Sequence, residues 1–103
     1  MLVGEQAGFV VVDIWKVKPG KRSELEATLA EAGRMFREVD GVLSVDYTTL
    51  KDDPDRYLVV FRYRDEATRE QFVSTPGLTS TMAKLRELWD LQSPIYQGVS
   101  KGL

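Results

Sequence analysis

The segment Phe9-Val10-Val11-Val12-Asp13-Ile14-Trp15-Lys16-Val17 carries the clearest structural signal in this sequence. It is rich in β-branched and aromatic residues and contains neither glycine nor proline, which predicts a β-strand. Because side chains of a strand alternate between its two faces, one face carries Phe9, Val11, Asp13, Trp15 and Val17 and the other carries Val10, Val12, Ile14 and Lys16. Both faces are mainly apolar, which is typical of a strand that is covered on both sides. The Asp13 carboxylate is therefore expected in apolar surroundings.

The residues after this strand predict a helix and then a hairpin. The turn Lys18-Pro19-Gly20 leads into residues 21–39, where apolar side chains recur every three or four positions. Asp40-Gly41 ends this helix, and Gly41 is suited to the left-handed conformation found there. Residues 42–50 and 56–64 predict two strands joined by a turn at 51–55, and strands so close in sequence form an antiparallel hairpin.

The last part of the chain predicts a broken helical region and a final strand. Asp65 suits the N-cap of a helix that continues to Ser74. Thr75-Pro76-Gly77 then interrupts it, as the hinge of a lid over a cavity or as a kink that wraps the helical region around the sheet. The apolar helical pattern resumes through Met82 and Trp89 and is followed by a strand at residues 93–100.

The order of these elements is βαββαβ. This order predicts a single α+β domain over residues 1–103 with the ferredoxin-like plan, a four-stranded antiparallel sheet with both helices on one face. The other face would still carry apolar side chains, namely those of Val10, Val12, Ile14, Leu58 and Val60. Because exposed apolar surface of this extent favours association, we expect a homodimer in which two sheets face each other.

The composition argues against several classes of function. The 103 residues carry a formal net charge of −2, which gives no basic surface for nucleic acid. The chain has no cysteine and no histidine, so we expect no metal site, no haem and no catalytic triad. The first eight residues lack the pattern of a signal peptide, and no stretch is apolar enough to span a membrane. We therefore expect a cytoplasmic protein without a membrane partner.

The first strand, the Pro-Gly turn into a helix, the hairpin and the segment RYLVVFRYRDEATREQF at residues 56–72 together resemble the antibiotic biosynthesis monooxygenase superfamily of dimeric α+β barrels. The likeness covers nearly the whole chain. It implies a pocket between sheet and helices in which molecular oxygen oxidises an aromatic substrate without an added cofactor. A haem-degrading branch of the superfamily uses an Asn, a Trp and a His.

The resemblance also assigns individual positions. Asp13 falls near the Asn of the haem-degrading branch, Tyr63 near its Trp and Phe72 near its iron-binding His. Phe61 falls where many relatives carry a Glu. The missing histidine implies that this chain does not degrade haem.

Three residues are the candidates for catalysis: Asp13, Trp15 and Tyr63. Asp13 could act as a general base or orient a phenolic hydroxyl, because burial raises the pKa of a carboxylate toward the range useful for proton transfer. The alternatives for Asp13 are an ion pair with Arg62 or Arg64 and simple exposure at a strand edge. Trp15 and Tyr63 could form an aromatic wall that offers hydrogen-bond donors, or they could pack in the core.

Six further residues are candidates for substrate contact: Phe36, Tyr47, Phe61, Phe72, Met82 and Trp89. The alternative for these residues is core packing, or, for Tyr47, a place in the dimer interface. The helix arginines Arg34, Arg37, Arg69 and Arg86 are assigned to solvent-facing sides.

These observations favour a homodimeric, cofactor-independent monooxygenase whose partners are molecular oxygen and a small phenolic, quinol or polyketide-like aromatic substrate. Two other functions stay open. One is a non-catalytic small-molecule-binding or scaffold homodimer. The other is an isomerase or cyclase, which would need the same carboxylate but no oxygen.

Overall fold

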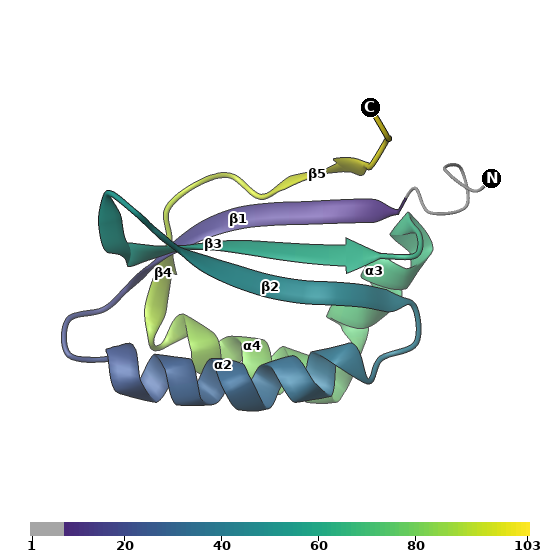
Figure 1. Cartoon of the computed structure of the whole chain (residues 1–103). Helices are drawn as coiled ribbons and strands as arrows, with labels where there is room; N and C mark the ends of the chain where they lie inside the picture. The colour runs from purple at the N-terminus through teal and green to yellow at the C-terminus, as the bar shows by residue number, and fades with distance from the viewer. Residues whose placement is uncertain (1–7) are drawn as a thin grey trace.

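A computed structural model describes residues 8–103; the residues before Gly8, on which part of the signal-peptide prediction rests, lie outside the described range. Figure 1 shows two layers, a sheet above and helices beneath it. The sheet contains β1 (Phe9–Val17), β2 (Val42–Leu50), β3 (Asp53–Tyr63), β4 (Trp89–Leu91) and β5 (Tyr96–Val99), and the helices are α2 (Arg22–Arg37), α3 (Glu66–Ser74) and α4 (Pro76–Arg86). The predicted α+β, ferredoxin-like plan is confirmed, except that the described residues form a five-stranded sheet where four strands were predicted.

Strand β1 lies inside the sheet and contacts three other strands. The strand order is β2-β3-β1-β4, β5 also pairs with β1, and every pairing is antiparallel. β4 pairs with the end of β1 from Trp15 to Val17, whereas β5 pairs with its beginning from Phe9 to Val12. Two short strands therefore share one edge of β1.

This arrangement corrects the prediction of one strand at residues 93–100. The chain between β4 and β5 holds Ile14 in two other ways: the Ile14 backbone N–H donates to Ser93 Oγ at 3.1 Å, and the Gln92 N–H donates to the Ile14 carbonyl oxygen at 2.7 Å. Pro94 follows directly in the sequence and has no backbone N–H to donate to a neighbouring strand. This edge of β1 is therefore paired in two separate stretches, with β5 before Ile14 and with β4 after it.

The sequence had predicted that Trp89 belongs to the apolar stripe of the helix, but Trp89 instead begins β4. Helix α4 ends at Arg86, and the next residues join the edge of β1, where the Lys18 N–H donates to the Leu88 carbonyl oxygen at 2.9 Å. Leu85, Leu88 and Trp89 are all buried. The apolar spacing thus continues beyond the helix because the same core buries residues of both elements.

The hairpin turn is also shorter than predicted. β2 ends at Leu50 and β3 begins at Asp53, so Pro54 lies within β3 and not in a loop. The pairing of β3 with β1 reaches only to Arg56. Pro54 therefore interrupts no hydrogen bond on that side of the strand.

Turns and caps hold the helices as the sequence indicated. Gly41 has φ +89°, and a Cβ at this position would lie 2.6 Å from Thr68 Cγ2, so only glycine fits. The Asp65 side chain accepts hydrogen bonds from Thr68 N at 2.8 Å and Thr68 Oγ1 at 2.6 Å, which caps α3. Thr75 separates α3 from α4, at the predicted interruption.

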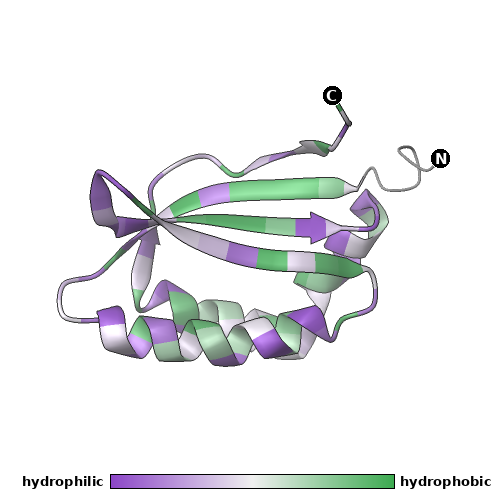
Figure 2. Cartoon of the chain, in the orientation of Figure 1, coloured by the Kyte–Doolittle hydropathy of each residue, from purple (hydrophilic) through white to green (hydrophobic). Residues whose placement is uncertain are grey.

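The core lies between the sheet and the helices. β1 and β3 bury alternate side chains on this side, and Figure 2 shows hydrophobic residues along much of both strands. The opposite face of the sheet is only half-buried; its apolar side chains are those of Val10, Val12, Ile14, Leu58 and Val60. One chain therefore covers one face of its sheet fully and the other in part.

A polar cluster attaches the beginning of α2 to the hairpin. The Tyr57 hydroxyl donates to Glu26 Oε2 at 2.7 Å and accepts from an Arg22 guanidinium N–H at 2.8 Å, and Arg22 also pairs with Asp55. The Tyr57 side chain is fully buried. Burial, reinforced by Glu26, raises the pKa of Tyr57 to about 12.

Candidate active site

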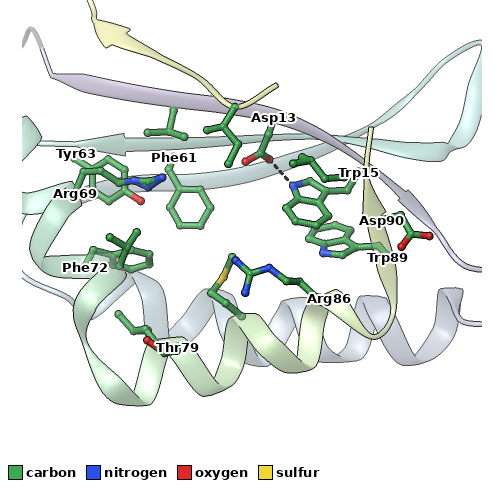
Figure 3. A pocket seen from close by; sticks show the side chains of 16 residues that line it. Asp13, Trp15, Phe61, Tyr63, Arg69, Phe72, Thr79, Arg86, Trp89 and Asp90 are labelled. Atoms are coloured by element: carbon green, nitrogen blue, oxygen red, sulfur yellow. Dashed lines mark hydrogen bonds between the residues drawn. The ribbon is translucent and has the colours of Figure 1, made fainter. Parts of the chain in front are cut away.

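Two cavities open between the sheet and the helices. The first has a volume of about 380 Å³ and lies between β1 and the helices α3 and α4 (Figure 3). The second has a volume of about 530 Å³ and lies between α2 and the strands β2 and β3. Both volumes are in the range of small-molecule sites. Five residues border both cavities: Asp13, Trp15, Phe61, Met82 and Trp89.

Asp13 projects from β1 toward the first cavity, and the residue as a whole is only 8% exposed. The Trp15 Nε1–H donates to Asp13 Oδ1 at 2.6 Å, the hydrogen bond drawn in Figure 3. Both side chains point to the same face because they are two positions apart in a strand. The hydrogen bond fixes the carboxylate and leaves its second oxygen without a hydrogen-bond partner among residues 8–103.

The surroundings make this carboxylate more basic. Burial raises the pKa of Asp13 above its ordinary value, and the Trp15 N–H and the positive charge of Arg69 lower it only in part. A carboxylate with a raised pKa accepts a proton more readily near neutral pH. The site can therefore supply a general base although the chain has no histidine.

The other interpretations of Asp13 are wrong. Arg64 pairs with Asp40 and Asp65, at 3.5 and 3.8 Å. Arg62 is exposed and lies opposite Val10 in the sheet, on the face away from Asp13. Asp13 is thus neither paired with these arginines nor exposed at a strand edge.

Two indole rings form one end of the first cavity. Trp15 and Trp89 stack with their ring centroids 5.0 Å apart and an interplanar angle of 20°. Trp89 is 3% exposed, and its Nε1–H has no hydrogen-bond partner among the described residues. The stack presents a flat apolar surface beside the Asp13 carboxylate (Figure 3).

The other end is lined by phenyl and phenol rings. Phe61 lies 5.5 Å from Phe72 and 5.8 Å from Tyr63, measured between ring centroids, and Phe36 packs behind them, 5.3 Å from Phe72. Burial strongly raises the pKa of Tyr63, so its hydroxyl stays protonated at neutral pH. These aromatic rings pack in the core and also line a cavity, so both roles that the sequence suggested for them are present in the structure.

All nine candidate residues line one cavity or the other. The first cavity contacts seven of them: Asp13, Trp15, Phe61, Tyr63, Phe72, Met82 and Trp89. Phe36 and Tyr47 contact only the second cavity. The structure therefore brings the three catalytic candidates together at the first cavity, whereas Phe36 and Tyr47 share only the second cavity with Asp13 and Trp15.

Sequence reasoning missed four arginines at the cavities. Arg69 and Arg86 line the first cavity, and Arg34 and Arg37 line the second. Arg34, Arg37 and Arg86 are exposed, as predicted, whereas Arg69 is half-buried. In Figure 3, Arg86 extends from α4 toward the cavity, and Arg69 lies beside Tyr63. A signal was present in the spacing, because Arg69 is three positions before Phe72 and Arg86 is four after Met82.

A family model described as "Antibiotic biosynthesis monooxygenase" matches residues 8–84. The chain belongs to the antibiotic biosynthesis monooxygenase family. The matched region contains Asp13, Trp15 and most of the residues that line the first cavity; the other lining residues, Arg86, Trp89, Asp90, Leu91 and Ile95, follow it.

Several solved structures share the fold of this family member. SnoaB, a cofactor-independent oxygenase from Streptomyces nogalater, is 18% identical, with a TM-score of 0.76 and 94% of each chain covered. A Mycobacterium tuberculosis protein is 25% identical, with a TM-score of 0.72, covering 93% of this chain and 95% of that one. A conserved protein from Methanosarcina mazei has a TM-score of 0.80 at 14% identity over the whole of both chains. A search of curated proteins gave no match.

Two further observations concern the described residues. No group of three or more Asp, Glu, His or Cys side chains within residues 8–103 is arranged to hold a metal ion. None of the helices in this range is both long and apolar enough to cross a membrane.

Proposed function

We propose that this protein is a cofactor-independent monooxygenase that oxidises a small phenolic or quinol-type aromatic molecule with molecular oxygen. The observation that carries the proposal is the buried Asp13 carboxylate, held by the Trp15 N–H at the wall of an aromatic cavity. Family membership and the SnoaB-like fold support the same class of reaction.

In the proposed reaction, Asp13 removes a proton from the substrate, and the stacked indole rings hold the flat ring system in place. Deprotonation makes the carbon framework electron-rich, so that it can transfer electrons to oxygen. In an anthrone, the methylene carbon loses two hydrogen atoms and gains one oxygen atom as a carbonyl. The second oxygen atom of O₂ leaves as water.

A direct test is oxygen uptake with anthrone or a quinol, comparing the parent protein with Asp13→Asn. We expect the rate to fall about 100-fold or more, in the range typical for loss of a general base. Asp52→Asn is the matched control, because it makes the same change at an exposed turn that lines neither cavity. Unchanged turnover in Asp13→Asn would contradict the role of Asp13 as the general base.

A non-catalytic binding protein is the second candidate. It is favoured by the packing of Phe36, Phe61 and Phe72, whose rings lie within 5.5 Å of one another and fill part of the space between sheet and helices. Saturable binding of anthrone without oxygen uptake would support it. An isomerase or cyclase would instead turn over its substrate in the absence of oxygen.

We also propose that the protein acts as a homodimer. The support is the half-buried apolar face of the sheet, on which Val10, Val12 and Ile14 of β1 lie beside Leu58 and Val60 of β3. Tyr96 of β5 pairs with Val12 on the same face and is 57% exposed. A second copy of the chain offers a matching surface to cover these side chains.

A further inference from the structure

The two cavities adjoin at five residues that border both, which we call the partition: Asp13, Trp15, Phe61, Met82 and Trp89. The cavities measure about 380 and 530 Å³. A planar ligand too long for the first cavity would have to pass these residues to reach the second.

Four members of the partition are held firmly. Asp13 and Trp15 are joined by a hydrogen bond of 2.6 Å, and Trp89 stacks on Trp15 at 5.0 Å. Phe61 lies within 5.8 Å of three other rings. Each of the four is less than a tenth exposed. Moving any of them would break a hydrogen bond or an aromatic contact within the core.

Met82 is different from the other four. It is half-buried at the edge of the core and comes from α4, the helix that begins immediately after the interruption at Thr75. Its helical neighbours Thr79 and Arg86 line the first cavity and are exposed. A methionine side chain is unbranched and adapts readily to its surroundings. Met82 is therefore the member of the partition that can withdraw.

We propose that Met82 sets the upper size limit of the substrate by closing the first cavity against the second. A planar aromatic molecule that fits the first cavity binds with Met82 in place, and a longer one is accepted only when this side chain is displaced or shortened. The inference rests on the proposed function for the chemical class of the ligand. It makes Met82 a residue that determines specificity, with no part in the oxidation itself.

The test compares anthrone, which has three fused rings, with tetracenone, its linear four-ring homologue. Binding is followed by quenching of tryptophan fluorescence, because Trp15 and Trp89 border both cavities, and turnover is followed by oxygen uptake. Met82→Ala joins the cavities. Met35→Ala is the matched control, since Met35 is 41% exposed on α2 and lines neither cavity.

We expect Met82→Ala to raise the affinity for tetracenone relative to that for anthrone about tenfold over the parent, a difference typical of steric selection in an apolar pocket. Met35→Ala should behave as the parent. Met82→Val keeps a larger apolar side chain than alanine and should therefore show a smaller gain in tetracenone affinity. It replaces Met82→Ala in the test if the alanine variant does not fold.

The outcomes separate this inference from the proposed function. Equal tetracenone affinity in the parent and the folded Met82 variants, or an equal gain in Met35→Ala, overturns the role of Met82. Binding of both compounds without oxygen uptake overturns the monooxygenase function, while the ratio of their affinities still decides the role of Met82. Failure of both compounds to bind any variant overturns both proposals.

Discussion

The carboxylate of Asp13 is buried, and the Trp15 indole is its hydrogen-bond donor within the described residues. Burial raises its pKa, which means that the folded protein favours the protonated form more than the unfolded chain does. The contribution of Asp13 to stability is therefore greatest below the pKa of the unfolded chain and is lost as the pH rises. At neutral pH the ionised carboxylate destabilises the fold.

At the scale of this residue, we expect Asp13→Asn to raise the free energy of unfolding at pH 7 by about 1 kcal/mol. The amide oxygen can still accept the Trp15 N–H, and the cost of burying a charge is removed. The difference from the parent should shrink as the pH falls and disappear at about pH 3, below the ordinary aspartate pKa, where Asp13 is protonated in both the folded and the unfolded chain. Urea unfolding at both pH values measures this, with Asp52→Asn as the exposed control. A loss of stability at pH 7 would contradict the argument.

The sequence was informative about single residues where strand alternation decided the outcome. Asp13, Trp15 and Tyr63 were predicted together because each lies on the helix-facing side of β1 or β3. The stack of Trp15 on Trp89 was not predicted, because β4 has only three residues and shows no period of its own. The cavity arginines were missed because an arginine can be exposed to solvent and still line an open cavity, as Arg34, Arg37 and Arg86 do.

At the scale of elements, α2 is attached to the hairpin through Tyr57, whose hydroxyl contacts both Arg22 and Glu26. The raised pKa of about 12 means that the folded protein keeps the phenolic proton when the unfolded chain has lost it. This contribution is complete below about pH 10, the usual tyrosine pKa, and is lost as the pH rises toward 12.

We therefore expect Tyr57→Phe to lower the free energy of unfolding by about 1–2 kcal/mol at pH 7, because two hydrogen bonds to charged groups are lost. The gap between parent and variant should narrow as the pH rises from about 10 to about 12. Guanidinium unfolding across this pH range measures whether the stability difference between parent and variant narrows as expected. Tyr96→Phe, at an exposed position of β5, is the control and should change little. A gap that widens with pH would contradict the assignment.

The sequence predicted the elements better than their ends. The helix of residues 21–39 and the strands of the hairpin were found because their periodic patterns are long. The final strand was placed wrongly because its division depends on contacts with Ile14 from a distant part of the chain. Local patterns do not contain such tertiary hydrogen bonds.

At the scale of the whole molecule, the two faces of the sheet are unequal. The helix-facing side is buried by the chain itself, whereas the opposite side leaves Val10, Val12 and Val60 half-exposed and Tyr96 more than half-exposed. Charged residues such as Lys16 and Arg62 also lie on this side, away from the core. An apolar centre with charged residues around it is typical of a surface that binds a protein partner.

We expect the parent protein to elute as a dimer and Val12→Lys to elute as a monomer in size-exclusion chromatography with light scattering. Val12 lies in β1, which has paired strands on both sides, so a lysine ammonium here would be buried against the second copy without a counter-charge. In the single chain the same side chain can still reach water, because Val12 is only half-buried. The folded monomer should therefore persist. Ala27→Lys, at an exposed position of α2, is the control and should remain dimeric. A parent protein that is monomeric at micromolar concentration, or a dimer that tolerates Val12→Lys, would mean that this face meets something other than a second copy.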